Sequence, residues 1–166
     1  MTKLVSIIVS VYNKENFLNQ CIESLINLEI DKDSIEAIFV DDCSTDRSVE
    51  IVKSYEKDYD FIRLIQLPEN TGSPAEPRNV GIQEAQGKYI TLLDADDWLD
   101  TEGFPKVVEK VNADDADFGI GQSFKHTSKG VGYHGKFTNY KDESHLKPQD
   151  IEKIFRAVGP PGKLFK

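Results

Sequence analysis

Cysteine is scarce in this chain of 166 residues, which contains only Cys21 and Cys43. Two cysteines cannot form the disulfide framework of a small secreted domain, and they fit a reducing compartment. Long apolar runs are also missing, because no stretch approaches the roughly 18 residues of a membrane-spanning helix. The first three residues lead directly into a strand-like run without a signal peptide. We therefore expect a cytoplasmic protein rather than a secreted or membrane-spanning one.

Basic residues are outnumbered by acidic ones. The chain has 20 Lys and Arg residues against 29 Asp and Glu residues, which gives a net charge of -9. This balance argues against a nucleic-acid partner, because binding to phosphates needs clustered Lys and Arg. The composition is otherwise that of a soluble enzyme, with 39% hydrophobic and 30% charged residues. A chain of this length can bury a core of its own as a single domain.

Apolar runs alternate with segments of helical periodicity along the first hundred residues. The runs are rich in β-branched residues and are typical of strands covered on both faces. They occupy residues 4–11, 35–40, 62–67 and 89–93. The segments between them predict helices, the first capped by Asn13 and the third with Pro77 at its first position. This alternation predicts an α/β fold with a mainly parallel central sheet flanked by helices.

The pattern is weaker after residue 100. It predicts a helix at residues 102–111 and a strand at 118–124. It then predicts an exposed excursion or lid at 125–147 and a short helix at 148–158. The three histidines, His126, His134 and His145, lack a usual metal-ligand spacing. We therefore interpret them as surface residues. An apolar pair, Leu164 and Phe165, begins a new segment just before the chain stops. We therefore expect a C-terminally truncated fragment of a longer polypeptide.

Polar clusters follow each of the four predicted strands. They lie at residues 12–13, 41–42, 70–78 and 94–97. Because the carboxyl ends of parallel strands meet at one edge of a sheet, we expect these clusters to converge there. Such an edge is where open α/β sheets bind their ligands.

The sharpest cluster is Asp94-Ala95-Asp96-Asp97, directly after an apolar run. Two carboxylates one residue apart at a strand end repel each other unless a cation lies between them. A hard divalent ion such as Mg2+ or Mn2+ would remove that repulsion and could also hold a diphosphate. The alternative is a solvated acidic turn that caps the next helix.

Two further clusters also have an alternative structural explanation. Asp41 and Asp42 could hydrogen-bond a ligand N–H group, or they could cap the helix that follows. Gly72 allows unusual backbone angles in the third loop, and Arg78 could clamp a phosphate. The alternative for Arg78 is a surface ion pair with Glu76.

Four blocks of sequence resemble the GT-A glycosyltransferases of family 2. The first is Val-Ser-Ile-Ile-Val-Ser-Val-Tyr-Asn at residues 5–13, and the second is Val-Asp-Asp-Cys-Ser-Thr-Asp at residues 40–46. The third extends from Asn-Thr-Gly to Pro-Arg-Asn at residues 70–79, and the fourth is Leu-Asp-Ala-Asp-Asp at residues 93–97. Order and spacing match over roughly the first 115 residues. The second block and the Pro-Arg-Asn-Val string are most similar to the teichoic-acid β-N-acetylglucosaminyltransferases of Gram-positive bacteria.

The resemblance implies a Rossmann-like fold that binds a nucleotide-sugar donor, which would be a UDP-sugar such as UDP-GlcNAc. By position in the matched blocks, Ser10, Val11 and Tyr12 would line the uracil pocket. Asp42 would accept the uracil N3–H. Both roles belong to the strand ends of the first two blocks.

The third and fourth blocks imply contacts to the rest of the donor. Asn70 and Arg78 would address the ribose or the diphosphate. Asp94 would lie near the ribose and the metal, Ala95 would belong to the same donor-binding set, and Asp96 would ligate the metal directly. The implied metal is Mn2+ or Mg2+, which would neutralise the UDP leaving group.

The resemblance also implies inversion at the anomeric carbon by direct displacement, with a polysaccharide or teichoic acid as acceptor. The catalytic base is expected beyond Lys166, so no residue here is assigned to it. Residues 1–166 would then be a truncated GT-A catalytic domain, with a nucleotide-binding half at 1–100 and the start of an acceptor half at 101–166. Missing regions could hold the enzyme peripherally at the inner face of the membrane.

The sequence departs from the family at Ser10, where the family usually has proline. Its net charge of -9 would also repel a polyanionic acceptor at long range. The remaining alternatives are a donor-binding fragment without turnover and a phosphatase of the Asp-x-Asp type. The phosphatase needs its motif on an early strand, with Thr or Val at the position that Trp98 occupies here. A response-regulator receiver would need the acidic pair after the first strand.

Overall fold

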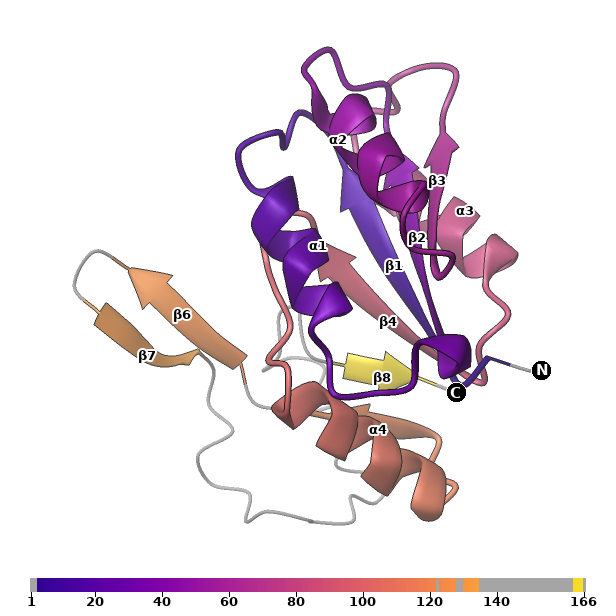
Figure 1. The fold of residues 1–166 in the computed structure, drawn as a ribbon, viewed down its shortest axis with the longest axis vertical. Coiled ribbons are helices and arrows are strands. Elements are labelled where there is room, and N and C mark those ends of the chain that lie inside the picture. Colours follow the sequence, from indigo (N-terminus) through magenta and orange to yellow (C-terminus); the bar gives the residue numbers. More distant parts are fainter. Residues whose placement is uncertain (1–2, 122, 128–129, 135–162, 166) are drawn as a thin grey trace.

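The computed structural model describes residues 3–121, 123–127, 130–134 and 163–165 (Figure 1). Its strands are β1 (Val5–Val11), β2 (Ile35–Asp41), β3 (Ile62–Gln66), β4 (Tyr89–Asp94), β5 (Phe118–Ile120), β6 (Ser123–Thr127), β7 (Gly130–His134) and β8 (Lys163–Phe165). Its helices are α1 (Leu18–Ile26), α2 (Ser48–Glu56), α3 (Ala75–Glu84) and α4 (Gly103–Ala113), with a short 3-10 helix at Lys32–Ser34.

The central sheet has six strands in the order β3-β2-β1-β4-β8-β5. The first four are parallel, and β8 is antiparallel to both of its neighbours. The predicted α/β fold with a mainly parallel sheet is therefore confirmed. The register places Val11 beside Asp41 and Ser10 beside Asp94, so the carboxyl ends of β1, β2 and β4 lie at one edge.

The helices cover both faces of the parallel part of the sheet (Figure 1). One face packs against α1, α2 and α4 in a core that includes Ile7, Val9 and Phe39. The other face packs against α3 through Ile8 and Ile38. Because alternate side chains of a strand point to opposite faces, both sets in β1 must be apolar, which explains its continuous apolar run.

Two predicted helix starts were wrong. Asn13 does not cap α1, which begins at Leu18; its backbone is left-handed, with φ of 51°, and its side chain accepts a hydrogen bond from the backbone N–H of Thr45. Pro77 is the third residue of α3 rather than the first. Proline is tolerated there because the N–H groups of a first helical turn have no partner within the helix.

The predicted strand at 118–124 was wrong in its extent. It divides into β5, in the central sheet, and β6, which pairs with β7 in a separate antiparallel hairpin. The residues at the end of the chain form β8 between β4 and β5. The predicted short helix at 148–158 lies outside the described residues, as does most of the predicted excursion at 125–147.

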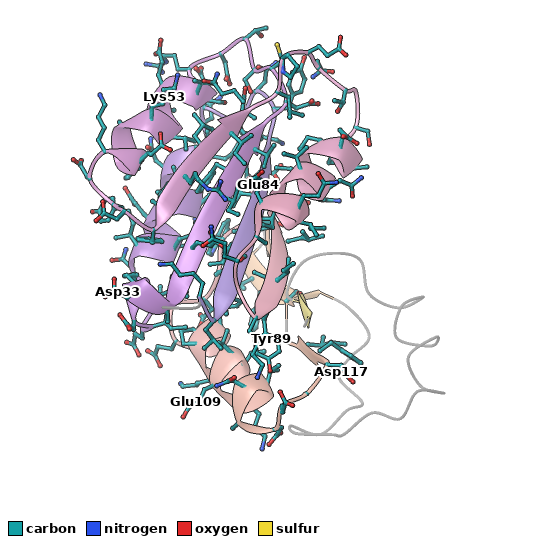
Figure 2. The ribbon with its side chains drawn as sticks, turned by 90° about the vertical axis from the view of Figure 1, so that its right-hand side faces the viewer. Asp33, Lys53, Glu84, Tyr89, Glu109 and Asp117 are labelled. Atoms are coloured by element: carbon teal, nitrogen blue, oxygen red, sulfur yellow. The ribbon has the colours of Figure 1, made fainter. Side chains whose placement is uncertain are left out.

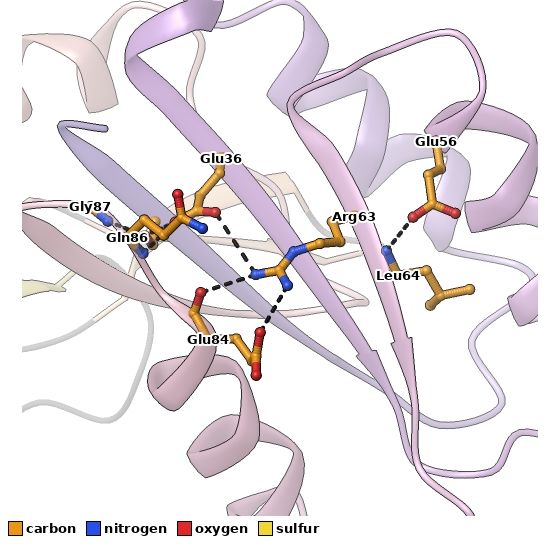
Figure 3. Close-up of polar contacts among 8 residues, drawn as sticks. Glu36, Glu56, Arg63, Leu64, Glu84, Gln86 and Gly87 are labelled. Atoms are coloured by element: carbon orange, nitrogen blue, oxygen red, sulfur yellow. Dashed lines mark hydrogen bonds and ion pairs between the residues drawn. The ribbon is translucent and has the colours of Figure 1, made fainter. Parts of the chain in front are cut away.

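A buried carboxylate, Glu36, joins three elements at the amino ends of the strands (Figure 3). Its Oε1 accepts hydrogen bonds from the Ser6 hydroxyl and the Gln86 backbone N–H, both at 2.6 Å. Its Oε2 lies 4.0 Å from Arg63, which also pairs with Glu84 at 2.9 Å. Because a buried carboxylate needs such partners, we assign Glu36 a structural role.

Helix α4 is attached to the same end of the sheet. Tyr89 begins β4, is fully buried, and donates its hydroxyl to the backbone carbonyl of Val111 at 3.2 Å. Figure 2 shows α4, marked by Glu109, close to Tyr89. The opposite edge of the sheet carries the polar loops. No helix among the described residues has both the length and the apolar character needed to cross a membrane.

Candidate functional site

The loops after β1 and β2 are hydrogen-bonded to each other at the carboxyl edge of the sheet. The backbone N–H of Asn13 donates to the Ser44 hydroxyl at 2.9 Å, and the Asn13 side-chain oxygen accepts from Thr45 N–H at 2.8 Å. The backbone N–H of Lys14 donates to the hydroxyl of Ser48, which is buried. These bonds fix the backbone from which the side chains of both loops project.

The three residues assigned to a uracil pocket contribute in different ways. Tyr12 is 47% exposed and is therefore available to contact a ligand. Val11 is buried in the core, and its carbonyl accepts a hydrogen bond from Asp42 N–H at 2.8 Å. Ser10 is partly buried, with its hydroxyl 3.5 Å from Asp94 Oδ1. Only Tyr12 of the three presents a large exposed side chain.

Asp42 directly follows β2, is buried, and is hydrogen-bonded to the third polar loop. Its Oδ1 accepts a hydrogen bond from Thr71 N–H, and its carbonyl accepts from the Asn70 side chain, both at 2.9 Å. Neighbouring Asp41 accepts from Ser44 N–H at 3.0 Å. Neither aspartate caps α2, which begins later, at Ser48. The helix-cap explanation for this pair is therefore wrong.

The third loop has a local geometry that presents Asn70 to Asp42. The Asn70 side-chain oxygen accepts a hydrogen bond from Gly72 N–H at 2.8 Å, while its nitrogen donates to Asp42. Gly72 has φ of 72°, a left-handed conformation that glycine adopts without steric cost. The sequence signal in Asn-Thr-Gly thus corresponds to a compact turn against the end of β2.

Arg78 projects from the first half of α3 to the end of β4. Its Nη2 lies 2.5 Å from Asp94 Oδ1, and its Nε is buried without a hydrogen-bond partner among the described residues. Its ion pair is therefore with Asp94 and not with Glu76. Because Asp94 Oδ1 also lies near the Ser10 hydroxyl, one carboxylate oxygen brings together β1, α3 and β4.

Asp96 lies one residue further along, in a turn closed by a hydrogen bond from Asp97 N–H to the Asp94 carbonyl at 2.9 Å. Ala95 is buried in the core between the two aspartates. The Oδ2 of Asp96 lies 2.6 Å from Lys14 Nζ. Sequence reasoning missed Lys14, since nothing local indicates a partner 82 positions away.

Each of the two candidate metal ligands thus pairs with a cationic side chain of the same chain. No group of three or more His, Cys, Asp or Glu residues in the described part of the protein is arranged to hold a metal. Mg2+ and Mn2+ are nevertheless commonly held by one or two carboxylates together with substrate phosphates and waters. Asp94 and Asp96 therefore fit a cation that is bound together with a diphosphate.

The acidic turn also affects the thiol beneath it. Burial, and after it the negative charges of Asp97, Asp96 and Asp94, raise the pKa of Cys21 to about 12. A thiol with this pKa is protonated at neutral pH and is a poor nucleophile. Cys43 is exposed in the loop after β2.

Comparisons with known proteins identify the family. Residues 6–160 match the sequence profile described as "Glycosyl transferase family 2". The chain belongs to this family. The chain is 33% identical, over 98% of its length, to a poly(ribitol-phosphate) beta-glucosyltransferase of Bacillus spizizenii, of which it covers 25%. The chain spans about a quarter of that relative, so the match does not by itself assign the relative's whole activity to it.

Solved structures also match. The crystal structure of residues 1–349 of Staphylococcus aureus TarS in complex with UDP aligns with a TM-score of 0.66 and 31% identity, covering 69% of this chain and 34% of the other. The complex of the same protein with UDP-GlcNAc aligns with the same score and covers 33% of that chain. The predicted GT-A fold and family resemblance are confirmed by these matches. Family membership leaves the phosphatase and receiver alternatives without support.

Proposed function

We propose that this chain is the nucleotide-sugar-binding part of an inverting, metal-dependent glycosyltransferase that uses a UDP-sugar, such as UDP-GlcNAc. The proposed acceptor is a teichoic acid or a related surface glycan. The observation that supports this most is that two pairs, Asp42 with Asn70 and Arg78 with Asp94, lie at the carboxyl edge of the sheet. The relatives named above are a poly(ribitol-phosphate) glycosyltransferase and a protein solved with UDP and with UDP-GlcNAc.

In this proposal, Asp42 reads the base. Its Oδ1 already accepts the Thr71 N–H, whereas Oδ2 receives no hydrogen bond from another described residue. An ionised carboxylate oxygen in this position can accept the N3–H of uracil. The adenine ring has no corresponding ring N–H donor, so Asp42 would favour uridine over adenosine nucleotides. Tyr12, which is half-exposed, would pack against the base.

Arg78 would then bind the diphosphate or the ribose beside Asp94. A guanidinium group offers several donors in a fixed plane, so Arg78 can keep its bond to Asp94 while another N–H group turns to an oxygen of the donor. Asn70 would hold the ribose side of the site from the loop after β3, which is hydrogen-bonded to Asp42. Asp96, with Asp94, would hold the divalent cation, which stabilises negative charge on the UDP leaving group.

The chemistry proposed is a direct displacement. The acceptor hydroxyl attacks the anomeric carbon, the bond to UDP breaks, and a carboxylate base takes the hydroxyl proton. We propose that this base lies beyond residue 166. We also propose that residues 1–100 form the nucleotide-binding half and that residues 101–166 begin the acceptor half.

A second candidate function is donor binding without turnover by this chain, favoured by its coverage of only 25% of the relative. Acceptor-dependent release of UDP separates the two.

The proposal predicts metal-dependent, uridine-selective binding. Calorimetric titration with UDP, in the presence and absence of Mn2+ and with ADP and GDP as controls, measures it directly. Asp42→Asn should weaken UDP binding by about 1 to 3 kcal/mol, the scale for one charge-assisted hydrogen bond, and should change ADP binding much less. Asp33→Asn, an exposed change at the other end of the sheet (Figure 2), is the matched control. Equal losses for UDP and ADP would show that Asp42 does not read the base.

A further inference from the structure

Lys14 is a cation built into the proposed metal site. Its Nζ lies 2.6 Å from Asp96 Oδ2, with 33% of the lysine side chain and 41% of the aspartate side chain exposed. It also lies 5.8 Å from the centre of the Phe17 ring, within the range of a cation–π contact. The ammonium thus has two favourable partners at the mouth of the acidic turn.

Hydrogen bonds hold the backbone of Lys14 independently of its side chain. Its N–H donates to the Ser48 hydroxyl at 2.8 Å. Its carbonyl accepts from the N–H groups of Phe17 and Leu18, at 2.9 and 3.1 Å, at the start of α1. The four-carbon stem of lysine is flexible, so the ammonium can leave Asp96 without any movement of the loop.

We propose that Lys14 is the resident counter-ion of Asp96 and competes with the divalent cation for it. This inference rests on the proposed function, because it assumes that Asp96 is a metal ligand. An ammonium at 2.6 Å from Oδ2 repels a second cation at the same carboxylate. Arg78 neutralises Asp94 in the same way. Without a nucleotide, both proposed metal ligands, Asp94 and Asp96, are therefore already paired with a cation.

A bound diphosphate changes this balance. It brings negative charge to the edge of the sheet, which attracts the ammonium of Lys14 away from Asp96 and supplies further oxygen ligands for the metal. The metal then binds more tightly together with the nucleotide than alone. In thermodynamic terms, Lys14 increases the coupling between the two ligands, and the coupling is reciprocal.

The test measures Mn2+ binding to the chain from the loss of the electron paramagnetic resonance signal of free Mn2+, with and without saturating UDP. Lys14→Met removes the ammonium and keeps the length of the side chain. It should tighten Mn2+ binding without UDP by about two- to fivefold, which corresponds to ~0.4 to 1 kcal/mol for an exposed ion pair. With UDP bound, the gain should disappear. Lys14→Arg should behave like the unaltered chain.

The matched control is Lys106→Met, which removes the same charge from an exposed pair between Lys106 of α4 and Glu102, the residue before that helix. Equal Mn2+ affinity for the unaltered chain and both Met variants would overturn the proposal and leave Lys14 as an ordinary surface ion pair. Weaker Mn2+ binding by Lys14→Met, or a large loss of UDP affinity with Mn2+ binding unchanged, would overturn it as well, since Lys14 would then assist the ligands directly.

Failure of the underlying assumption is distinguishable from these results. Asp96→Asn should abolish Mn2+ binding whether or not Lys14 competes. If Mn2+ bound with the same affinity to Asp96→Asn, the metal assignment itself would be wrong. UDP titrations of the same samples report separately whether the nucleotide site is present.

Discussion

At the scale of single residues, Asp46 connects the two loops that carry Tyr12 and Asp42. Its carboxylate accepts the backbone N–H of Glu15 at 3.0 Å and that of Ser48 at 2.9 Å. Partial burial acts to raise the pKa of Asp46, but hydrogen bonds from the Ser48 side chain and from backbone N–H groups outweigh it, so the pKa lies below its ordinary value of 3.8. The ionised form is therefore favoured by folding.

This shift predicts a contribution to stability that depends on pH. A carboxylate with a lowered pKa in the folded state stabilises the protein above its unfolded-state pKa, and the contribution is lost as pH falls through the folded-state value. Asp46→Asn should therefore lower stability at pH 7, by less than about 1 kcal/mol for a partly exposed group, and by less at pH 3, which lies below the ordinary pKa of 3.8. Urea denaturation of Asp46→Asn and Asp33→Asn at both pH values measures this. A deficit of Asp46→Asn that stayed constant with pH would contradict the assignment.

At the scale of elements, the close approach of α3 to the sheet depends on Gly81. A Cβ atom added there would overlap Ile8 Cγ2 and lie 3.3 Å from Val40 Cγ2. Both neighbours are fully buried, so neither can move away easily. Since α3 also carries Arg78, its position against β1 and β2 determines where the guanidinium lies.

We predict that Gly81→Ala destabilises the protein by about 1 to 3 kcal/mol, the usual cost of overpacking a core. It should also weaken UDP binding, because a displaced α3 moves Arg78 relative to Asp94. Gly132→Ala is the control, since a Cβ at Gly132 meets no atom within 4 Å. Thermal denaturation and UDP titration check both effects. A stability equal to that of Gly132→Ala would mean that the sheet can accommodate the methyl group.

The parallel sheet could be predicted because local signals suffice for it. β1 and β2 are apolar on both faces, and each is followed by turn-forming polar residues, so the carboxyl edge and its clusters were placed correctly from spacing alone. The ion pairs between these clusters could not be predicted. Arg78 pairs with Asp94 and not with nearby Glu76, because the packing of α3 against the sheet sets the position of its side chain. In the same way, Asn13 resembles a helix cap locally, but a partner 32 residues away determines its conformation.

The end of the chain was harder still. An alternating run at residues 118–127 is compatible with any antiparallel partner, and its division between two sheets depends on which strands are available. β5 pairs with β8, from more than forty residues further on, whereas β6 pairs with the adjacent β7. No periodicity within the run itself distinguishes these partners.

At the scale of the whole molecule, β8 joins β5 to the parallel strands of the central sheet. It pairs with Ile90 and Thr91 of β4 on one side and with β5 on the other. We predict that deletion of residues 163–166 lets the amides of β4 exchange with solvent about tenfold faster or more, as expected when a strand becomes an edge. Hydrogen–deuterium exchange measures this. Lys166→Ala is the control, and unchanged exchange in β4 after the deletion would show that β8 does not protect the strand.

The strand order has a consequence for synthesis on the ribosome. β1 is made before both of its neighbours in the sheet, β2 and β4, and β4 begins only at Tyr89. At ~5 to 20 residues per second, β1 waits roughly 4 to 17 seconds for its second neighbour. During that interval an apolar strand has an unpaired edge, which is a template for aggregation. Nascent chains of this protein are therefore most vulnerable, and most in need of a chaperone, before the acidic turn after β4 has been translated.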